Sequence, residues 1–221
     1  LFPFVIGDIP KDDNSQHITL AAETLAELHK KLWLARSLFM DVASLRQPIS
    51  KYRLLTANEI YNELLSEHTE EKLKSQCITS ELFFKLEKKC SEVLDRLEPY
   101  IKERQLIHGD FGASNLLINC ESNSVNAILD WEEMRWDSPL FELAGVIGFY
   151  EMDNPGTGKL FLSSYVDKIK KISHPNERNI IMSLDKINDA MFCANYLELT
   201  LMIESGHFEL EYIQELCQTM A

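Results

Sequence analysis

The stretch HGDFGASNLL at residues 108–117, followed by ILDWEE at residues 128–133, decides how this 221-residue chain folds. Two short apolar runs, at residues 116–118 and 125–129, flank a polar cluster. An apolar run, a polar turn and a second apolar run are typical of a β-hairpin with a multi-residue loop. We therefore expect a hairpin in this region.

Three polar residues flank or begin the expected hairpin at the spacing of a kinase active site. Asp110 precedes Asn115 by five residues, as the base Asp of a kinase catalytic loop precedes its metal-binding Asn, and Asp130 directly follows the hairpin. Asn115 and Asp130 offer the hard oxygen ligands that Mg²⁺ prefers. The carboxylate of Asp110 could orient a hydroxyl and accept its proton. The alternative interpretation is that both aspartates are turn residues at strand ends and that Asn115 caps a loop.

The flanking regions have helical periodicity, so the expected fold class is α+β, mainly helical with one small hairpin. A first helix is predicted from about Thr19 to Leu45, because this stretch has no Gly or Pro and carries one apolar face, made by Leu20, Leu25, Leu28, Leu32 and Phe39. Thr56 and Glu59 have the spacing of a capping box at the start of a second helix. Further helices are predicted over residues 79–103, 138–150, 159–172, 176–205 and 208–219.

Composition and charge argue against several classes of protein. The 22 Lys and Arg residues against 35 Asp and Glu give a net charge of −13, which makes nucleic acid an improbable partner. No apolar run approaches the roughly 20 residues that span a bilayer, so no membrane partner is expected. The five cysteines form no Cys-x-x-Cys pair, and buried thiols in a reducing compartment account for them. Cytoplasmic residence is therefore expected.

Both motifs resemble the active-site motifs of the aminoglycoside phosphotransferase and choline kinase-like family, which is similar in fold to protein kinases. The resemblance implies that Asp110 is the catalytic base and that Asn115 and Asp130 hold Mg²⁺. It also implies that His108 supports the catalytic loop. The segment DSPLFELA at residues 137–144 resembles the element that follows the metal-binding aspartate in that family. In this segment Glu142 stands where the family usually has Asp, and the resemblance implies that its carboxylate supports the catalytic loop.

The amino-terminal part of the chain resembles two other elements of the family. FVIGD at residues 4–8 looks like a hinge, where the backbone of Ile6, Gly7 and Asp8 would meet the base of ATP or GTP. TLAELH at residues 24–29 resembles the first long helix of the helical lobe. His29 itself has no His or Cys partner at ligand spacing, which favours a surface or helix-end position.

The resemblance also predicts a domain arrangement. Residues 1–10 would be the end of an amino-terminal lobe and the hinge, and residues 11–221 a helical carboxy-terminal lobe with its catalytic centre at 105–145. No Gly-rich loop followed by a strand Lys is present, so the amino-terminal lobe is expected to be largely absent. This chain by itself is therefore expected to be inactive.

The implied activity is ATP- and Mg²⁺-dependent transfer of the γ-phosphoryl group to a hydroxyl of a small, aminoglycoside-like molecule. A cationic acceptor fits the net charge and the position of Glu132, Glu133 and Trp136 beside Asp130. Further acidic candidates on the predicted helix 176–205 are Asp185, Asp189, Glu198 and Glu204. The alternatives are a metabolite kinase of the choline, homoserine or sugar type, and a non-catalytic kinase-like binding domain.

Overall fold

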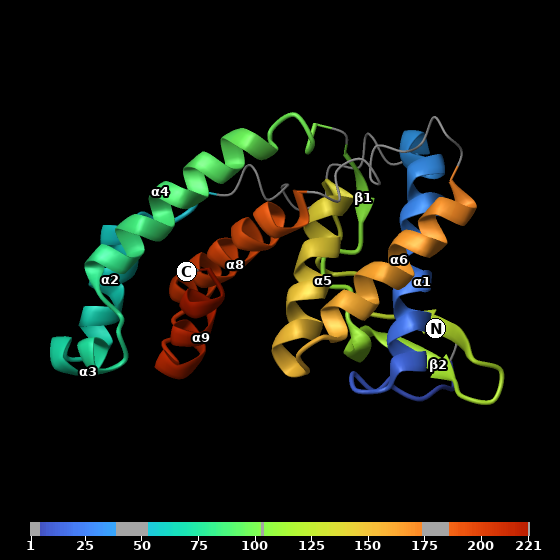
Figure 1. Cartoon of the computed structure of the whole chain (residues 1–221), viewed down its shortest axis with the longest axis horizontal. Helices are drawn as coiled ribbons and strands as arrows, with labels where there is room; N and C mark the ends of the chain where they lie inside the picture. Colours follow the sequence, from blue (N-terminus) through green and yellow to red (C-terminus); the bar gives the residue numbers. More distant parts are fainter. Residues whose placement is uncertain (1–4, 39–52, 103, 174–185, 221) are drawn as a thin grey trace. The chain divides into compact units, whose positions relative to one another are not determined.

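The computed structural model describes residues 5–38, 53–102, 104–173 and 186–220. The chain forms two compact units, the first made of Leu1–Pro48 and Tyr100–Ile187, the second of Ile49–Pro99 and Asn188–Ala221. Most described residues are helical, and the strands form small antiparallel sheets (Figure 1). The mainly helical α+β class predicted from the sequence is confirmed.

Three helices form the framework of the first unit. Helix α1 (Ser15–Ala35) packs against α6 (Thr157–Ile172), which crosses it obliquely and also packs against α5 (Pro139–Asp153) (Figure 1). Helix α1 begins four residues before the predicted start, because the side chain of Asn14 accepts hydrogen bonds from the next amides and caps the helix. It ends at Ala35, followed by a 3₁₀ turn, η1 (Arg36–Leu38). Residues 39–45, over which the helix was predicted to continue, lie outside the described residues.

The buried face of α1 differs from the leucine face suggested by the sequence. Leu20, Leu28 and Leu32 are only half-buried. The buried residues of this helix are Ile18, Ala21, Ala22, Leu25, Ala26 and His29. Since three of them are alanines, neighbouring elements can approach this face closely.

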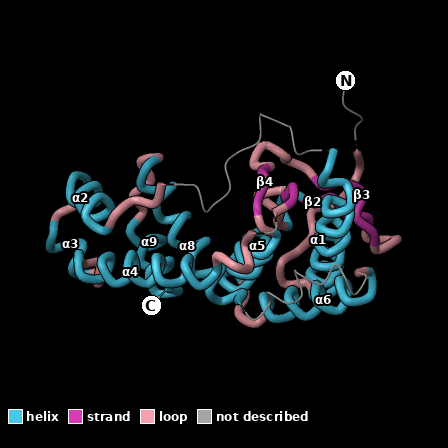
Figure 2. Tube along the Cα trace, turned by 90° about the horizontal axis from the view of Figure 1, so that it is seen from above, coloured by secondary structure: helices cyan, strands magenta, loops and turns pink. Residues whose placement is uncertain are grey.

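Two small sheets lie beside these helices (Figure 2). The predicted hairpin is confirmed as strands β2 (Leu116–Asn119) and β3 (Ser124–Ile128), with Leu116 opposite Ile128. A short 3₁₀ turn, η3 (Ala113–Asn115), leads into β2. A second sheet pairs β1 (Gln105–Ile107) with β4 (Arg135–Asp137). The sequence did not predict this sheet, because strands of three residues have no readable alternation.

The regular secondary structure described in the second unit is all helical. Its helices are α2 (Ala57–Glu67), α3 (Glu70–Ser75), α4 (Ser80–Leu97), α9 (Leu210–Met220) and all but the first residue of α8 (Ile187–Glu204). The capping box of Thr56 and Glu59 is confirmed at the start of α2. Helix α4 ends at Leu97, short of the predicted end at residue 103, and Pro99 lies two residues beyond it. Of the helix predicted over 176–205, residues 176–185 lie outside the described part.

Three of the five cysteines are buried, whereas Cys77 and Cys120 are exposed, so the prediction of buried thiols was wrong for these two. Among the helices that the structure describes, none combines the length and apolar character needed to cross a bilayer.

Candidate active site

Asp110 and Asn115 contact each other in the loop that follows β1. The side-chain nitrogen of Asn115 donates to Oδ2 of Asp110 at 2.9 Å and to the backbone carbonyl of Asp110 at 2.7 Å. The Asp110 side chain is exposed and that of Asn115 half-buried. Because the amide nitrogen of Asn115 faces Asp110, the amide oxygen is the atom of this side chain that could ligate a metal.

The hairpin carries Asp130 back to the same end of the sheet. Leu116 and Ile128 are paired across it, and the amide of Leu129 donates to the carbonyl of Asn115 at 2.8 Å. Asp130 then adopts a left-handed backbone with φ of 56°. This conformation costs most residues about 1–2 kcal/mol, and aspartate is among the few that tolerate it. Its backbone is thus held in an uncommon conformation at the position predicted for a metal ligand.

The donor set suits magnesium. Mg²⁺ keeps several waters and is bound through one or two carboxylates. Among the described residues, no three His, Cys, Asp or Glu side chains come together in a way that could hold a metal. The predicted ligands, the carboxylate of Asp130 and the amide oxygen of Asn115, are oxygen donors of the kind that Mg²⁺ takes.

His108 joins the two halves of this site. Its Nε2 lies 2.7 Å from the carbonyl oxygen of Leu129, and its Nδ1 lies 3.3 Å from the amide nitrogen of Asp110. Since a carbonyl only accepts and an amide N–H only donates, Nε2 carries the proton and Nδ1 accepts. The buried imidazole therefore ties the backbone of Asp110 to the residue before Asp130.

Gly109 is held on both sides and has no room for a side chain. Its amide donates to Oε1 of Glu142 at 2.5 Å, and its carbonyl accepts from Nη1 of Arg135 at 3.3 Å. Its φ is 89°, in the left-handed region. A Cβ at this position would lie 2.1 Å from the carbonyl oxygen of Glu133. The glycine between His108 and Asp110 is therefore a steric requirement.

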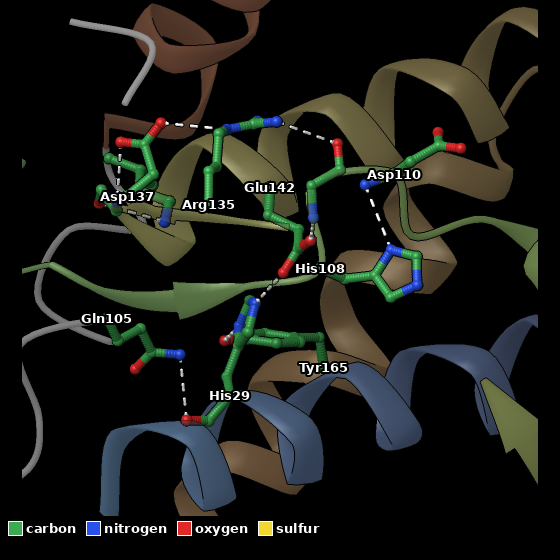
Figure 3. A network of polar contacts seen from close by, with 11 residues as sticks. His29, Gln105, His108, Asp110, Arg135, Asp137, Glu142 and Tyr165 are labelled. Carbon is green, nitrogen blue, oxygen red and sulfur yellow. Dashed lines mark hydrogen bonds and ion pairs between the residues drawn. The ribbon is translucent and has the colours of Figure 1, made fainter. Parts of the chain in front are cut away.

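A buried chain of hydrogen bonds lies behind Glu142 (Figure 3). Its Oε2 is 2.8 Å from Nε2 of His29, and Nδ1 of His29 is 2.8 Å from the hydroxyl of Tyr165 on α6. Gln105 donates to the backbone carbonyl of His29 at 3.1 Å. The surface or helix-end position predicted for His29 was wrong, because its side chain is fully buried. Its place on the alanine-rich face of α1 was the signal that could have shown this.

Glu142 is ionised at neutral pH despite its burial. Burial raises the pKa of this carboxyl, but the hydrogen bond and charge of His29 and the amide of Gly109 lower it more, so the pKa lies below its ordinary value of 4.5. Burial raises the pKa of Tyr165, so this residue stays a neutral hydroxyl. Glu142 thus presents a charged acceptor to the amide of Gly109.

The segment predicted to be the hinge lies against the hairpin. The amide and carbonyl of Asp8 bond to the carbonyl and amide of Ile118 at 2.9 and 2.8 Å. The carbonyl of Ile6 accepts from Nδ2 of Asn126 at 2.8 Å. A Cβ at Gly7 would lie 2.9 Å from Cβ of Leu117. Three backbone groups of the predicted hinge therefore already have partners within the chain.

The residues predicted to contact substrate have different surroundings. Glu132 is exposed in the turn after Asp130, and Glu133 is half-buried with its carbonyl directed at Gly109. Trp136 lies in β4 opposite Leu106 and is half-buried.

The acidic candidates farther along the chain include two with partners inside the second unit. Asp189 forms an ion pair with Arg96 at 3.0 Å, and Glu198 accepts from the hydroxyl of Tyr212 at 2.6 Å. Asp185 lies outside the described residues. The sequence did not single out Arg135, Tyr165 or Gln105, because none of them belongs to a motif.

Comparison with known proteins identifies the family. No curated protein sequence matches the chain significantly. Among solved structures, a GDP complex of an aminoglycoside 2'-phosphotransferase IIIa variant is 16% identical, with a TM-score of 0.62 and coverage of 97% of this chain and 68% of that one. Ethanolamine kinase from Plasmodium vivax is 15% identical, with a TM-score of 0.60 and coverage of 98% and 63%. Choline kinase from Cryptosporidium parvum is 15% identical, with a TM-score of 0.56 and coverage of 98% and 68%.

These likenesses confirm the protein-kinase-like fold predicted from the sequence. The chain spans less than two thirds of the length of the ethanolamine kinase. The sequence pattern of the phosphotransferase enzyme family (APH) matches residues 1–161, well over half of the chain. The chain belongs to the phosphotransferase enzyme family.

Proposed function

We propose that this chain carries the catalytic centre of a nucleotide- and Mg²⁺-dependent phosphotransferase that acts on a hydroxyl group of a small molecule. The observation that supports this most directly is the contact between Asn115 and the carboxylate of Asp110. A loop cap would need only the backbone contact of Asn115. The GDP complex of the related aminoglycoside phosphotransferase is consistent with a nucleoside triphosphate, ATP or GTP, as donor.

In this proposal each residue has one task. Asp110 accepts a hydrogen bond from the acceptor hydroxyl and takes up its proton as the new O–P bond forms. At the same time the bond between the γ-phosphorus and the bridging oxygen of the nucleotide breaks, and the nucleoside diphosphate leaves. Asn115 holds the Asp110 carboxylate in place and, with Asp130, would hold the metal. Bound Mg²⁺ neutralises charge on the phosphate oxygens. His108 keeps the loop and the metal-binding residue in register.

We further propose that the acceptor is cationic. Glu132 is exposed two residues after Asp130, and Trp131 is 36% exposed between them. A carboxylate and an aromatic face are the groups that recognise ammonium ligands. Two of the related structures are kinases of ethanolamine and choline, which adds support for an amino alcohol alongside an aminoglycoside.

The test is a phosphorylation screen with the full-length protein over aminoglycosides, choline, ethanolamine, homoserine, macrolides and neutral sugars. Asp110→Asn should lower turnover by about 10²- to 10⁴-fold, because it removes the base, while nucleotide binding persists. The matched control is Asp167→Asn, at an exposed aspartate on α6, which should leave turnover unchanged. Undiminished turnover of Asp110→Asn would refute the catalytic assignment. A preference for neutral or anionic acceptors would refute the proposal of a cationic acceptor.

The metal assignment is tested separately by calorimetry. Asp130→Ala should abolish Mg²⁺-dependent nucleotide binding, because a single amide oxygen does not replace a carboxylate. Unchanged affinity for the Mg²⁺ nucleotide would contradict this role of Asp130.

A further inference from the structure

Arg135, which lies outside the motifs of the sequence, contacts the catalytic loop directly. It lies in β4 opposite Ile107, the last residue of β1. Its Nη1 donates to the carbonyl of Gly109 at 3.3 Å, and its Nε donates to Oδ2 of Asp137 at 3.3 Å (Figure 3). One guanidinium thus donates to two acceptors. Because the group is planar and rigid, it fixes the position of the Gly109 carbonyl relative to the Asp137 carboxylate.

The carboxylate that orients Arg135 is itself fixed. Asp137 is buried, and its Oδ1 accepts from the amide of Ser138 at 2.7 Å. Ser138 in turn caps α5, its hydroxyl accepting from the amide of Leu140 at 3.3 Å. Removing the cation beside a buried carboxylate is strongly destabilising, because it leaves an uncompensated buried charge. The guanidinium is therefore anchored at the start of α5.

The bond from Arg135 acts on the peptide unit that leads into Asp110. The carbonyl of this unit belongs to Gly109 and bonds to Arg135, and its N–H belongs to Asp110 and bonds to Nδ1 of His108. Because a peptide unit is planar, fixing both ends fixes the direction in which the chain enters the next residue.

We propose that Arg135 is a positioning residue for Asp110 and acts by holding the Gly109 carbonyl. It does not touch the reacting atoms. The expected effect of Arg135 on turnover rests on the proposed function. Its expected effect on the structure of the loop does not.

The shape of the guanidinium matters as much as its charge. A lysine at position 135 would keep a cation near Asp137, but its ammonium is a point charge without a planar fork. Arg135→Lys therefore loosens the loop while it keeps the charge beside the buried carboxylate. Arg135→Met removes both interactions.

The experiment compares both variants with the full-length protein. In Arg135→Lys, kcat should fall about 10- to 100-fold with the KM for nucleotide close to that of the wild type, since misplacing a catalytic group by about 1 Å costs on that order. Hydrogen exchange at the Asp110 amide should become faster in both variants. The control is Arg96→Lys, which alters an Arg–Asp pair of 3.0 Å in the second unit and should change neither measurement.

The two readouts separate this proposal from the proposed function. If the wild type transfers phosphate to none of the acceptors, the proposed function is refuted. Hydrogen exchange at the Asp110 amide would still decide the role of Arg135. Unchanged exchange at the Asp110 amide in Arg135→Lys would overturn the proposal, as would a raised KM with unchanged kcat. If Arg135→Met does not fold, Arg135→Lys decides alone.

Discussion

Replacing Gly109 with alanine should disrupt the loop that carries Asp110 far more than the same replacement at Gly112. The added Cβ would lie 2.1 Å from the carbonyl oxygen of Glu133, 2.8 Å from its carbonyl carbon and 2.9 Å from Nη1 of Arg135. The closest neighbour is backbone and cannot rotate away. The methyl group would therefore displace either the loop or the turn after Asp130.

The cost follows from two contributions. A left-handed backbone costs alanine about 1–2 kcal/mol relative to glycine. Overpacking against a fixed neighbour adds about 1–3 kcal/mol. The free energy of unfolding of Gly109→Ala should fall by about 2–5 kcal/mol, a large part of the roughly 5–15 kcal/mol of a typical domain.

Urea denaturation of the 221-residue chain, followed by circular dichroism, measures this loss without any assumption about activity. Gly112→Ala is the matched control in the same loop. A Cβ there has only Oγ of Ser114 within reach, at 3.9 Å, and the backbone is extended with φ of −159°. This control should be neutral or stabilising by up to about 1 kcal/mol. Equal stabilities of the two variants would refute the steric argument.

Two further predictions concern the chain of bonds behind the loop. Because the folded pKa of Glu142 lies below 4.5, its stabilising contribution is complete above that pH and is lost as the pH falls through the folded pKa. The free energy of unfolding of Glu142→Gln should therefore be about 1–3 kcal/mol lower than that of the wild type at pH 7, and urea titrations at several pH values should show the gap closing below pH 4.5. A gap that is independent of pH would contradict an ionised Glu142. Tyr165→Phe should lower the free energy of unfolding by about 1–2 kcal/mol and also lower kcat, because it removes the hydroxyl beside His29. Tyr196→Phe, which removes a buried hydroxyl bonded to Leu55 in the second unit, should cost similar stability and leave kcat unchanged. Equal kcat values for these two tyrosine variants would argue against the role of Tyr165.

The hairpin and its flanking polar residues were predictable because they are local in sequence. Strands β2 and β3 are joined by a short loop, so their apolar runs and the turn stand together in one window. The pairing of β1 with β4 is not local. Leu106 pairs with Trp136, and the whole hairpin lies between these two residues in the sequence. No window contains both strands, and each is only three residues long.

His29 shows why the buried part of the site was missed. The buried face of α1 was predicted from its leucines, yet Leu28 is half-buried and His29 is fully buried. A buried histidine needs partners for both ring nitrogens, and these come from Glu142 and Tyr165, 113 and 136 residues away. Such partners are set by how α1, α5 and α6 pack, which no local pattern of the sequence contains.

The two side chains that bond to Gly109 have opposite charges. Each bonds to the backbone group whose partial charge is opposite to its own. The carboxylate of Glu142 accepts the N–H, and the guanidinium of Arg135 donates to the carbonyl. Hydrogen bonds to charged groups are each worth about 1.5–3 kcal/mol, more than neutral ones. The two charges come from separate elements, α5 and β4, and Arg135 is anchored through Asp137 at the start of α5. Both sides of the residue that precedes Asp110 are therefore held from consecutive elements, by Arg135 of β4 at the carbonyl and by Glu142 of α5 at the N–H.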